Sequence, residues 1–167
     1  PLDFPRASGA ATSPVPDGGG AVTATCAVQQ GIFERDCAII TPPGLPEGTK
    51  MPVVFLLHGF GDGPVDVRGA GDWANAVVER QFMLVTPAGL FNSWNAGGCC
   101  GPAKGTNIDD VGYLTTLVQE IAKRPDVDPS RIFMAGFSNG GMMMYRFLCD
   151  SGDLVKAAAS VAGTKVT

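Results

Sequence analysis

Three short, uninterrupted apolar runs constrain the fold of this chain more than any other feature of its sequence. They are MPVVFLLH (residues 51–58), FMLVT (82–86) and RIFMA (131–135). An apolar run of this length is typical of a strand buried on both faces of a parallel sheet. AAASVA (157–162) is a weaker candidate of the same kind. TATCAVQ and RDCAII, nearer the N-terminus, are expected to form two strands paired around Gly31.

Helical patterns lie between these runs. Apolar residues recur at helical spacing after Asp109 or Asp110, either of which can serve as the N-cap, and Pro125 ends the pattern. Further helices are expected over about residues 70–80 and after Ser138. Alternating strands and helices predict an α/β fold, with about six mostly parallel strands and helices on both faces. Ligands bind such sheets at the carboxyl ends of the strands.

Composition sets the domain count and excludes two classes of function. A chain of 167 residues can bury one hydrophobic core. The net charge is −4 and no cluster of Lys or Arg is present, so the sequence shows no basic surface for nucleic acid. No apolar run is long enough to span a membrane. Residues 1–22 are rich in Pro and Gly and are expected to form a flexible leader. Residues 23–167 then form the folded domain.

The five cysteines indicate an oxidising, extracellular setting, so we expect a secreted protein. No C-x-x-C motif is present, and His58, the one histidine, cannot complete a structural zinc site with these cysteines. No metal or other cofactor is expected. The cysteines are Cys26, Cys37, Cys99, Cys100 and Cys149.

The cysteine spacing suggests pairings without fixing them. Cys26 and Cys37 lie on the two strands expected to pair and could close that hairpin. Cys99 or Cys100 could reach Cys149 on the helix after Ser138, which would leave one thiol over. A bridge between the adjacent Cys99 and Cys100 is less favoured because of its strain. The alternative is that the thiols are reduced and buried.

The stretch GFSNG (residues 136–140) contains the strongest functional signal. It fits G-x-S-x-G and lies directly between an expected strand and an expected helix, which is the context of a nucleophile elbow. Gly136 and Gly140 allow the tight turn. The helix N-terminus directs peptide N–H groups towards Ser138, where they would stabilise an oxyanion.

A second signal follows the run at residues 51–58, in LLHGFGDG (56–63). In this kind of site the loop after that strand supplies a second oxyanion donor. We expect the N–H groups of Phe60 and Asn139 to be the donors. His58 and Gly59 are expected to support the loop, rather than His58 acting as the general base.

Four motifs resemble one family, the secreted α/β-hydrolases that comprise polyhydroxybutyrate depolymerases and related feruloyl and acetylxylan esterases. The motifs are LLHGFGD, SWNAGGCCG (93–101), IDDVGYL (108–114) and VDPSRIFMAGFSNGGMMMYRFLC (127–149). The resemblance covers about residues 26–167. It implies an α/β-hydrolase fold and hydrolysis of small or polymeric carboxylic esters through an acyl-serine, without metal or cofactor. Ser138 matches the nucleophile, and Phe60 and Asn139 match the oxyanion donors.

The triad acid and histidine of this family have no counterpart here. They belong after the seventh and eighth strands, and only Asp150 and Asp153 follow Ser138 as acids, at the end of the next helix. We therefore expect the N-terminal portion of a longer hydrolase, truncated before those strands and nearly inactive alone. A C-terminal segment or a second chain would complement it.

Two alternatives remain open at this point. Trp94 could line a cleft for an aromatic ester, or it could pack the loop that contains it. The chain could also be a non-catalytic hydrolase-like module used for binding or assembly.

Overall fold

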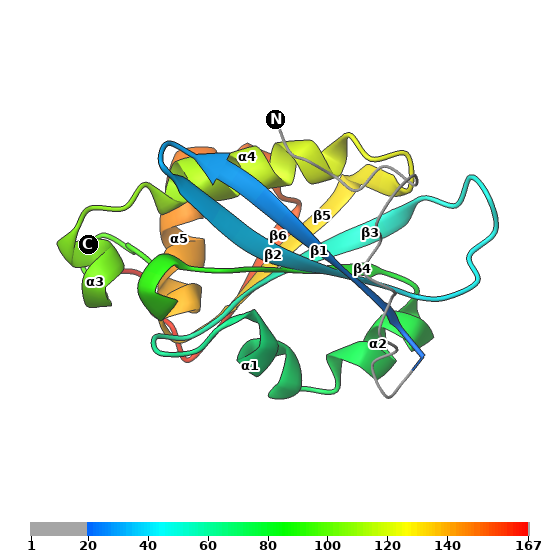
Figure 1. Ribbon diagram of the computed structural model, residues 1–167, viewed down its shortest axis with the longest axis horizontal. Helices are drawn as coiled ribbons and strands as arrows, with labels where there is room; N and C mark the ends of the chain where they lie inside the picture. The colour runs from blue at the N-terminus through cyan, green and yellow to red at the C-terminus, as the bar shows by residue number, and fades with distance from the viewer. Residues whose placement is uncertain (1–19, 167) are drawn as a thin grey trace.

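The computed structural model describes residues 20–166, which form one six-stranded sheet with the strand order β1-β2-β4-β3-β5-β6. Strands β4, β3, β5 and β6 run parallel, β2 pairs antiparallel with β4, and β1 pairs antiparallel with β2 (Figure 1). The strands are β1 Val22–Gln30, β2 Phe33–Thr41, β3 Met51–Leu57, β4 Met83–Pro87, β5 Val127–Phe137 and β6 Ala157–Val161. The predicted sheet of six mostly parallel strands is confirmed.

The N-terminal hairpin forms as the sequence predicted. Gly31 turns the chain with a φ of +60°, a value that favours glycine. Cys26 lies directly opposite Cys37 in the β1–β2 register, and the two are joined by a disulfide. The hairpin is therefore closed both by its ladder and by a covalent bond.

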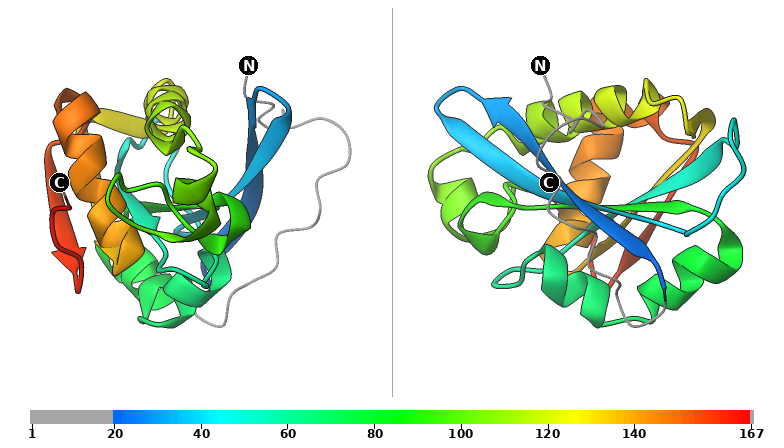
Figure 2. Two further views of the ribbon diagram at one scale, coloured as in Figure 1. Left: turned by 90° about the vertical axis from the view of Figure 1, so that its left-hand side faces the viewer. Right: turned by 45° about the vertical axis from the view of Figure 1, so that its right-hand side comes forward.

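Helices cover both faces of the sheet, as predicted (Figures 1 and 2). On one face, α4 (Asp110–Ala122) and α5 (Asn139–Ser151) bury the larger core, which includes Phe55, Leu117 and Phe147. On the other face, α1 (Pro64–Gly69) and α2 (Trp73–Arg80) cover a smaller core. Alternating side chains of the strands enter one core or the other, which explains their continuous apolar runs.

Two short helices were not predicted, α1 and α3 (Gly101–Gly105). Each has a proline in its first turn and is too short to show an apolar period. Helix α2 begins at Trp73, three residues later than expected. At the start of α4, the Asp109 side chain accepts a hydrogen bond from the Gly112 N–H at 2.8 Å, so Asp109 is the N-cap.

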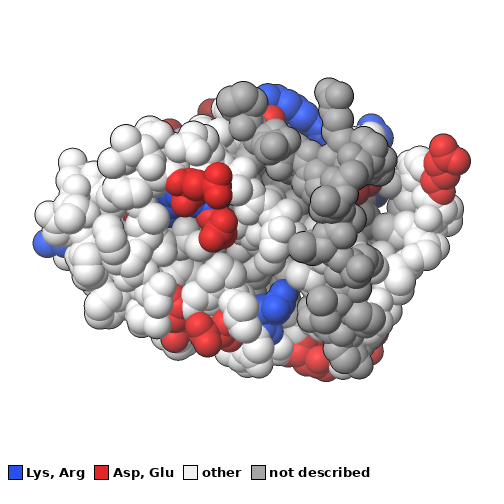
Figure 3. Space-filling model, viewed as in Figure 1, with Lys and Arg blue, Asp and Glu red and all other residues white. Residues whose placement is uncertain are grey.

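The predicted leader falls mostly on residues 1–19, outside the described residues, and β1 begins at Val22. Within residues 20–166, no helix is both long and apolar enough to cross a membrane. The surface seen in Figure 3 is mostly uncharged, and its Lys and Arg side chains are separated from one another.

Two 3-10 turns complete the described elements. One, Leu90–Asn92, follows β4, and the other, Gly152–Leu154, follows α5. The first places Phe91 and Asn92 at positive φ beside the carboxyl end of the sheet. The loops after β3, β4 and β5 all leave the sheet at this end, where a parallel sheet presents its binding residues.

Candidate active site

Ser138 occupies a sharp turn between β5 and α5. Its φ and ψ are +50° and −117°, values that non-glycine residues rarely adopt. Its peptide N–H donates to the Val161 carbonyl of β6 at 2.8 Å, which holds the turn against the sheet. A strained serine between a strand and a helix is the conformation of a nucleophile elbow.

Glycines surround this turn because backbone comes too close for a side chain. A Cβ on Gly136 would overlap the carbonyl of Gly140, and a Cβ on Gly140 would overlap the carbonyls of Leu57 and His58 at the end of β3. These are main-chain atoms with little freedom to move. The supporting role expected for both glycines therefore has a direct steric basis.

Asn139 is the first residue of α5, so its peptide N–H has no partner within the helix. Its side chain is completely buried. The side chain pairs with both peptide groups of Trp94: Oδ1 accepts from the Trp94 N–H at 2.7 Å, and Nδ2 donates to the Trp94 carbonyl at 3.0 Å. The orientation of the first turn of α5 is thereby tied to the loop after β4.

His58 uses both ring nitrogens in holding loops. Nε2 accepts a hydrogen bond from the Gly89 N–H at 2.9 Å, so Nδ1 carries the proton and donates to the Gly59 carbonyl at 2.7 Å. Burial lowers the pKa of this imidazole, although the bond to Gly59 opposes the shift. A neutral imidazole with both nitrogens engaged is not available as a base for Ser138. It joins the β3 and β4 loops instead.

Phe60 lies at the mouth of this region with 56% of its surface exposed. The adjacent Gly61 N–H donates to the Asn92 carbonyl at 2.8 Å, and the Phe60 ring rests against Gly101, where a Cβ would overlap it. The loop is therefore fixed on both sides of Phe60. The use of the Phe60 N–H as an oxyanion donor stays a prediction.

Of the two alternatives that the sequence left open for Trp94, the structure shows the one in which it packs the loop that contains it. The residue is fully buried, its indole N–H donates to the His58 carbonyl at 3.0 Å, and its ring centroid lies 5.0 Å from that of His58. The aromatic side chain packs the loop. Its burial depends on contacts from β3, β2 and α5, which the local sequence does not reveal.

The pairing of the remaining cysteines is the one that the sequence favoured less. Cys99 and Cys100 are bonded to each other, across a cis peptide bond, and Cys149 is exposed and free. The possible bridge from Cys99 or Cys100 to Cys149 is therefore not formed here. Since the adjacent pair consumes both loop thiols, none is left to reach Cys149.

The acids that follow Ser138 lie far from it. Asp150 is next to the last residue of α5, about 16 Å along the helix from its first residue, and its carboxylate faces Arg146 at 4.0 Å. Asp153 is exposed in the following 3-10 turn. Both are solvated residues, as the sequence indicated, and neither is placed to act with Ser138.

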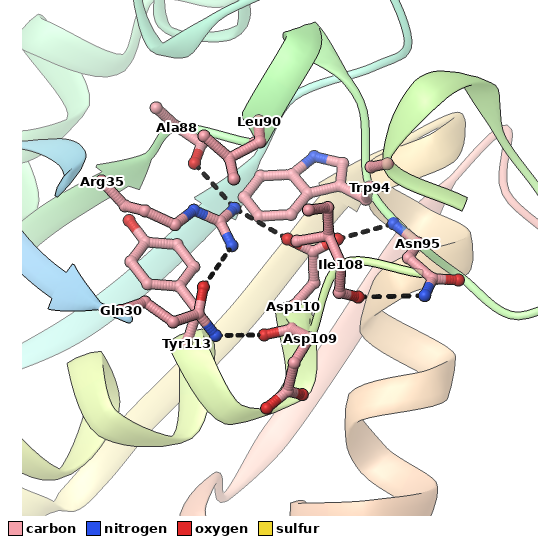
Figure 4. Close-up of polar contacts among 12 residues, drawn as sticks. Gln30, Arg35, Ala88, Leu90, Trp94, Asn95, Ile108, Asp109, Asp110 and Tyr113 are labelled. Atoms are coloured by element: carbon pink, nitrogen blue, oxygen red, sulfur yellow. Dashed lines mark hydrogen bonds and ion pairs between the residues drawn. The ribbon is translucent and has the colours of Figure 1, made fainter. Parts of the chain in front are cut away.

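A buried ion pair that was not predicted from the sequence lies beside this site. Arg35 of β2 and Asp110 of α4 meet at 2.7 Å with both side chains completely buried (Figure 4). Asp110 had been expected to serve only as a possible N-cap. The two residues are far apart in sequence, and nothing in the local pattern around either indicates the contact.

Two further features lie outside the site. A hollow of about 570 Å³ is lined by residues that include Thr41, Glu47, Met51 and Arg124, at the amino end of β3 and so at the opposite edge of the sheet from Ser138. Among residues 20–166, no group of three His, Cys, Asp or Glu side chains is arranged to hold a metal ion.

Comparison with known proteins identifies relatives of this chain. The profile of the prolyl oligopeptidase family matches residues 103–166. Feruloyl esterase B of Piromyces equi is 41% identical over 132 residues, which cover 77% of this chain and 24% of that protein. This chain thus spans about a quarter of the length of that relative.

Solved structures show the same fold. A ferulic acid esterase superposes with a TM-score of 0.62 at 21% identity, covering 86% of this chain and 60% of that one. An S-formylglutathione hydrolase from Agrobacterium tumefaciens superposes with a TM-score of 0.66 at 18% identity, covering 88% and 60%. At these identities the likeness establishes the arrangement of strands and helices.

Proposed function

We propose that this chain, which has the α/β-hydrolase fold, carries the nucleophile of a carboxylic ester hydrolase. The observation that carries the proposal is the conformation of Ser138, held at positive φ between β5 and α5 by glycines whose surroundings exclude a side chain. Feruloyl esterases among its relatives favour esters as the substrates.

The reaction begins when Ser138 Oγ attacks the ester carbonyl carbon and passes its proton to a general base. The carbonyl oxygen becomes an oxyanion, which accepts hydrogen bonds from the N–H groups of Asn139 and Phe60. When the intermediate collapses, the C–O bond to the leaving group breaks and the alcohol takes the proton from the base. Water then attacks the acyl-serine by the same route and releases the acid.

We propose that the general base and its acid partner lie outside these 167 residues. His58 is the one histidine of the sequence, and both of its ring nitrogens are engaged with Gly59 and Gly89. Without the base, turnover is expected to fall by several orders of magnitude. The relatives give no support for a second chain as the source of these groups, so a further segment of the same chain is the simpler source.

Aromatic and acetyl esters of plant polysaccharide are the substrates proposed, because feruloyl esterases and an acetylxylan esterase are among the relatives. Polyesters of the polyhydroxybutyrate type rest on the resemblance of motifs alone. The Cys26–Cys37 disulfide favours a secreted protein acting outside the cell.

Peptide hydrolysis is a second candidate, favoured by the match of residues 103–166 to the prolyl oligopeptidase family. The same elbow can attack an amide or an ester. The two activities differ in the leaving group, so parallel assays with both kinds of substrate separate them.

The test uses the full-length protein that contains this chain, assayed with methyl ferulate, an aryl acetate and a proline-containing peptide anilide. Hydrolysis of the two esters, lost in Ser138→Ala and retained in Ser130→Ala at the other end of β5, is the expected result. Faster cleavage of the anilide would replace the esterase with a peptidase. No Ser138-dependent turnover of any substrate would leave a non-catalytic hydrolase-like module.

A further inference from the structure

Arg35 is held in the core from several directions at once. Its guanidinium donates to the Ala88 carbonyl at 3.0 Å and to Gln30 Oε1 at 3.1 Å, and it meets Asp110 at 2.7 Å. Its central carbon lies 3.8 Å from the centroid of the Tyr113 ring. Figure 4 shows this side chain between the hairpin, the loop after β4 and the start of α4. Such contacts fix the position of the guanidinium and hence of its carboxylate partner.

Asp110 in turn holds the loop after β4. Its second oxygen, Oδ2, accepts a hydrogen bond from the buried Asn95 N–H at 2.7 Å. The Asn95 carbonyl accepts from Arg146 of α5 at 2.6 Å. The Asn95 side chain donates to the Ile108 carbonyl at 2.9 Å (Figure 4). The polar groups of Asn95 are thus bound on several sides, with Asp110 as the one negatively charged partner.

The peptide next to Asn95 is the one that holds the first residue of α5. Trp94 presents its N–H and its carbonyl to the side-chain amide of Asn139. A displacement of residues 94–95 would therefore move Asn139, which follows Ser138 in the chain. The peptide N–H of Asn139 is proposed to donate a hydrogen bond to the oxyanion.

We infer that the Arg35–Asp110 pair positions residues 94–95 and, through them, the oxyanion-binding N–H of Asn139. This role rests on the proposed function. The pair is a positioning device, because neither side chain reaches Ser138 in the contacts described. The buried pair thus acts on the reaction through residues 94–95, without contacting the reacting atoms.

A purely stabilising role is the alternative, and the physics of buried ion pairs disfavours it. Removing two charges from water costs much of what their attraction returns, so well-packed apolar residues often replace such a pair with little loss of stability. Specific geometry is what an apolar replacement cannot supply. In particular, it cannot accept the hydrogen bond from the Asn95 N–H.

Two double variants of the full-length protein separate these roles. Arg35→Met with Asp110→Leu removes the charges and the acceptor for Asn95, whereas Arg35→Met with Asp110→Asn removes the charges and keeps an acceptor. We expect the leucine variant to lose about 100-fold in kcat with KM within about twofold, because a misplaced donor near the reacting atoms costs about that much. We expect the asparagine variant to recover about 10-fold of the loss.

Hydrogen exchange gives a readout that is independent of turnover. In the leucine variant the amides of Trp94, Asn95 and Asn139 are expected to exchange faster, while those of β3 stay protected. Arg35→Lys keeps the positive charge and loses the planar guanidinium. If the leucine variant does not fold, this variant tests the same inference. It is expected to show a smaller fall in kcat with the same pattern of exchange.

The matched control is Arg131→Met with Asp128→Asn, an exposed pair at the opposite end of β5. This control is expected to keep the wild-type kcat. A folded leucine variant with wild-type kcat and wild-type exchange at Asn139 would overturn the inference, as would an Arg35→Lys variant unchanged in both. Retained turnover in Ser138→Ala would instead overturn the proposed function, and the exchange experiment would still decide the coupling between Asp110 and Asn139.

Discussion

Around Ser138, segments of backbone approach so closely that only glycine fits between them. Gly140 lies against the carbonyls at the end of β3, and Gly163, after β6, lies against the carbonyl of Ser138. The partners are main-chain atoms of the sheet and the helix, so they cannot rotate away as a side chain would. The position of the nucleophile is therefore set by close backbone packing.

Gly140→Ala is predicted to destabilise the protein by about 1–3 kcal/mol, because its methyl group would overlap the Leu57 and His58 carbonyls and force the helix from the sheet. The urea midpoint measures this loss. Gly105→Ala, at the end of α3, is the control because the space around its Cβ position is open. It should change the free energy of unfolding by no more than about 0.5 kcal/mol. Equal midpoints for the two variants would show that the elbow tolerates a side chain.

His58 predicts a pH dependence of stability with a definite sign. Burial lowers the pKa of its imidazole in the folded protein, while the unfolded chain takes up the proton near pH 6.5. Below that pH the unfolded state binds more protons, so the free energy of unfolding falls as the pH drops, by at most about 1.4 kcal/mol per pH unit. The stability is fully present above about pH 7.

Unfolding of the wild type and of His58→Gln, measured between pH 7.5 and 5.5, tests this expectation. His58→Gln should flatten the dependence over this range, whatever its effect on stability at pH 7.5. Carboxyl groups contribute equally in both proteins, so the difference isolates the imidazole. An undiminished slope in His58→Gln would show that this histidine is not held neutral.

Among the elements, the β1–β2 hairpin is the one that a covalent bond secures. The Cys26–Cys37 disulfide closes a short loop at the antiparallel edge of the sheet. Arg35 lies on the same hairpin and enters the core beside Trp94. The position of the β1–β2 hairpin therefore affects the position of the loop after β4.

Replacing both cysteines, Cys26→Ala with Cys37→Ala, is predicted to cost about 2–3 kcal/mol, because the unfolded chain regains the entropy of an open loop. Denaturant unfolding measures the difference from the wild type. Cys149→Ala removes an exposed free thiol and should leave the midpoint unchanged. A double variant as stable as the wild type would mean that the ladder alone secures the hairpin.

The sequence predicted the elements that have a local pattern and missed those that do not. Continuous apolar runs located the parallel strands, and a glycine-flanked serine after such a run located the elbow at Ser138. Helices α1 and α3 escaped because five or six residues carry no period. The burial of Trp94 and the Arg35–Asp110 contact depend on segments distant in sequence, so no local pattern could reveal them.

In the whole molecule, the candidate functional residues lie at the edge of the sheet formed by the carboxyl ends of the parallel strands. Hydrogen bonds join His58 after β3, Trp94 after β4 and Asn139 of α5. The buried Arg35–Asp110 pair joins the β1–β2 hairpin to α4. Helices on both faces fix this edge. The central claim that follows is that Ser138 forms the covalent acyl-enzyme.

The most direct test is covalent labelling of the full-length protein with a fluorophosphonate, followed by intact mass and peptide mapping. The reagent loses fluoride as its phosphorus bonds to an activated serine oxygen. The account predicts one added phosphonyl group, located on Ser138 and absent from Ser138→Ala. A label on another residue, or undiminished labelling and ester turnover in Ser138→Ala, would contradict it.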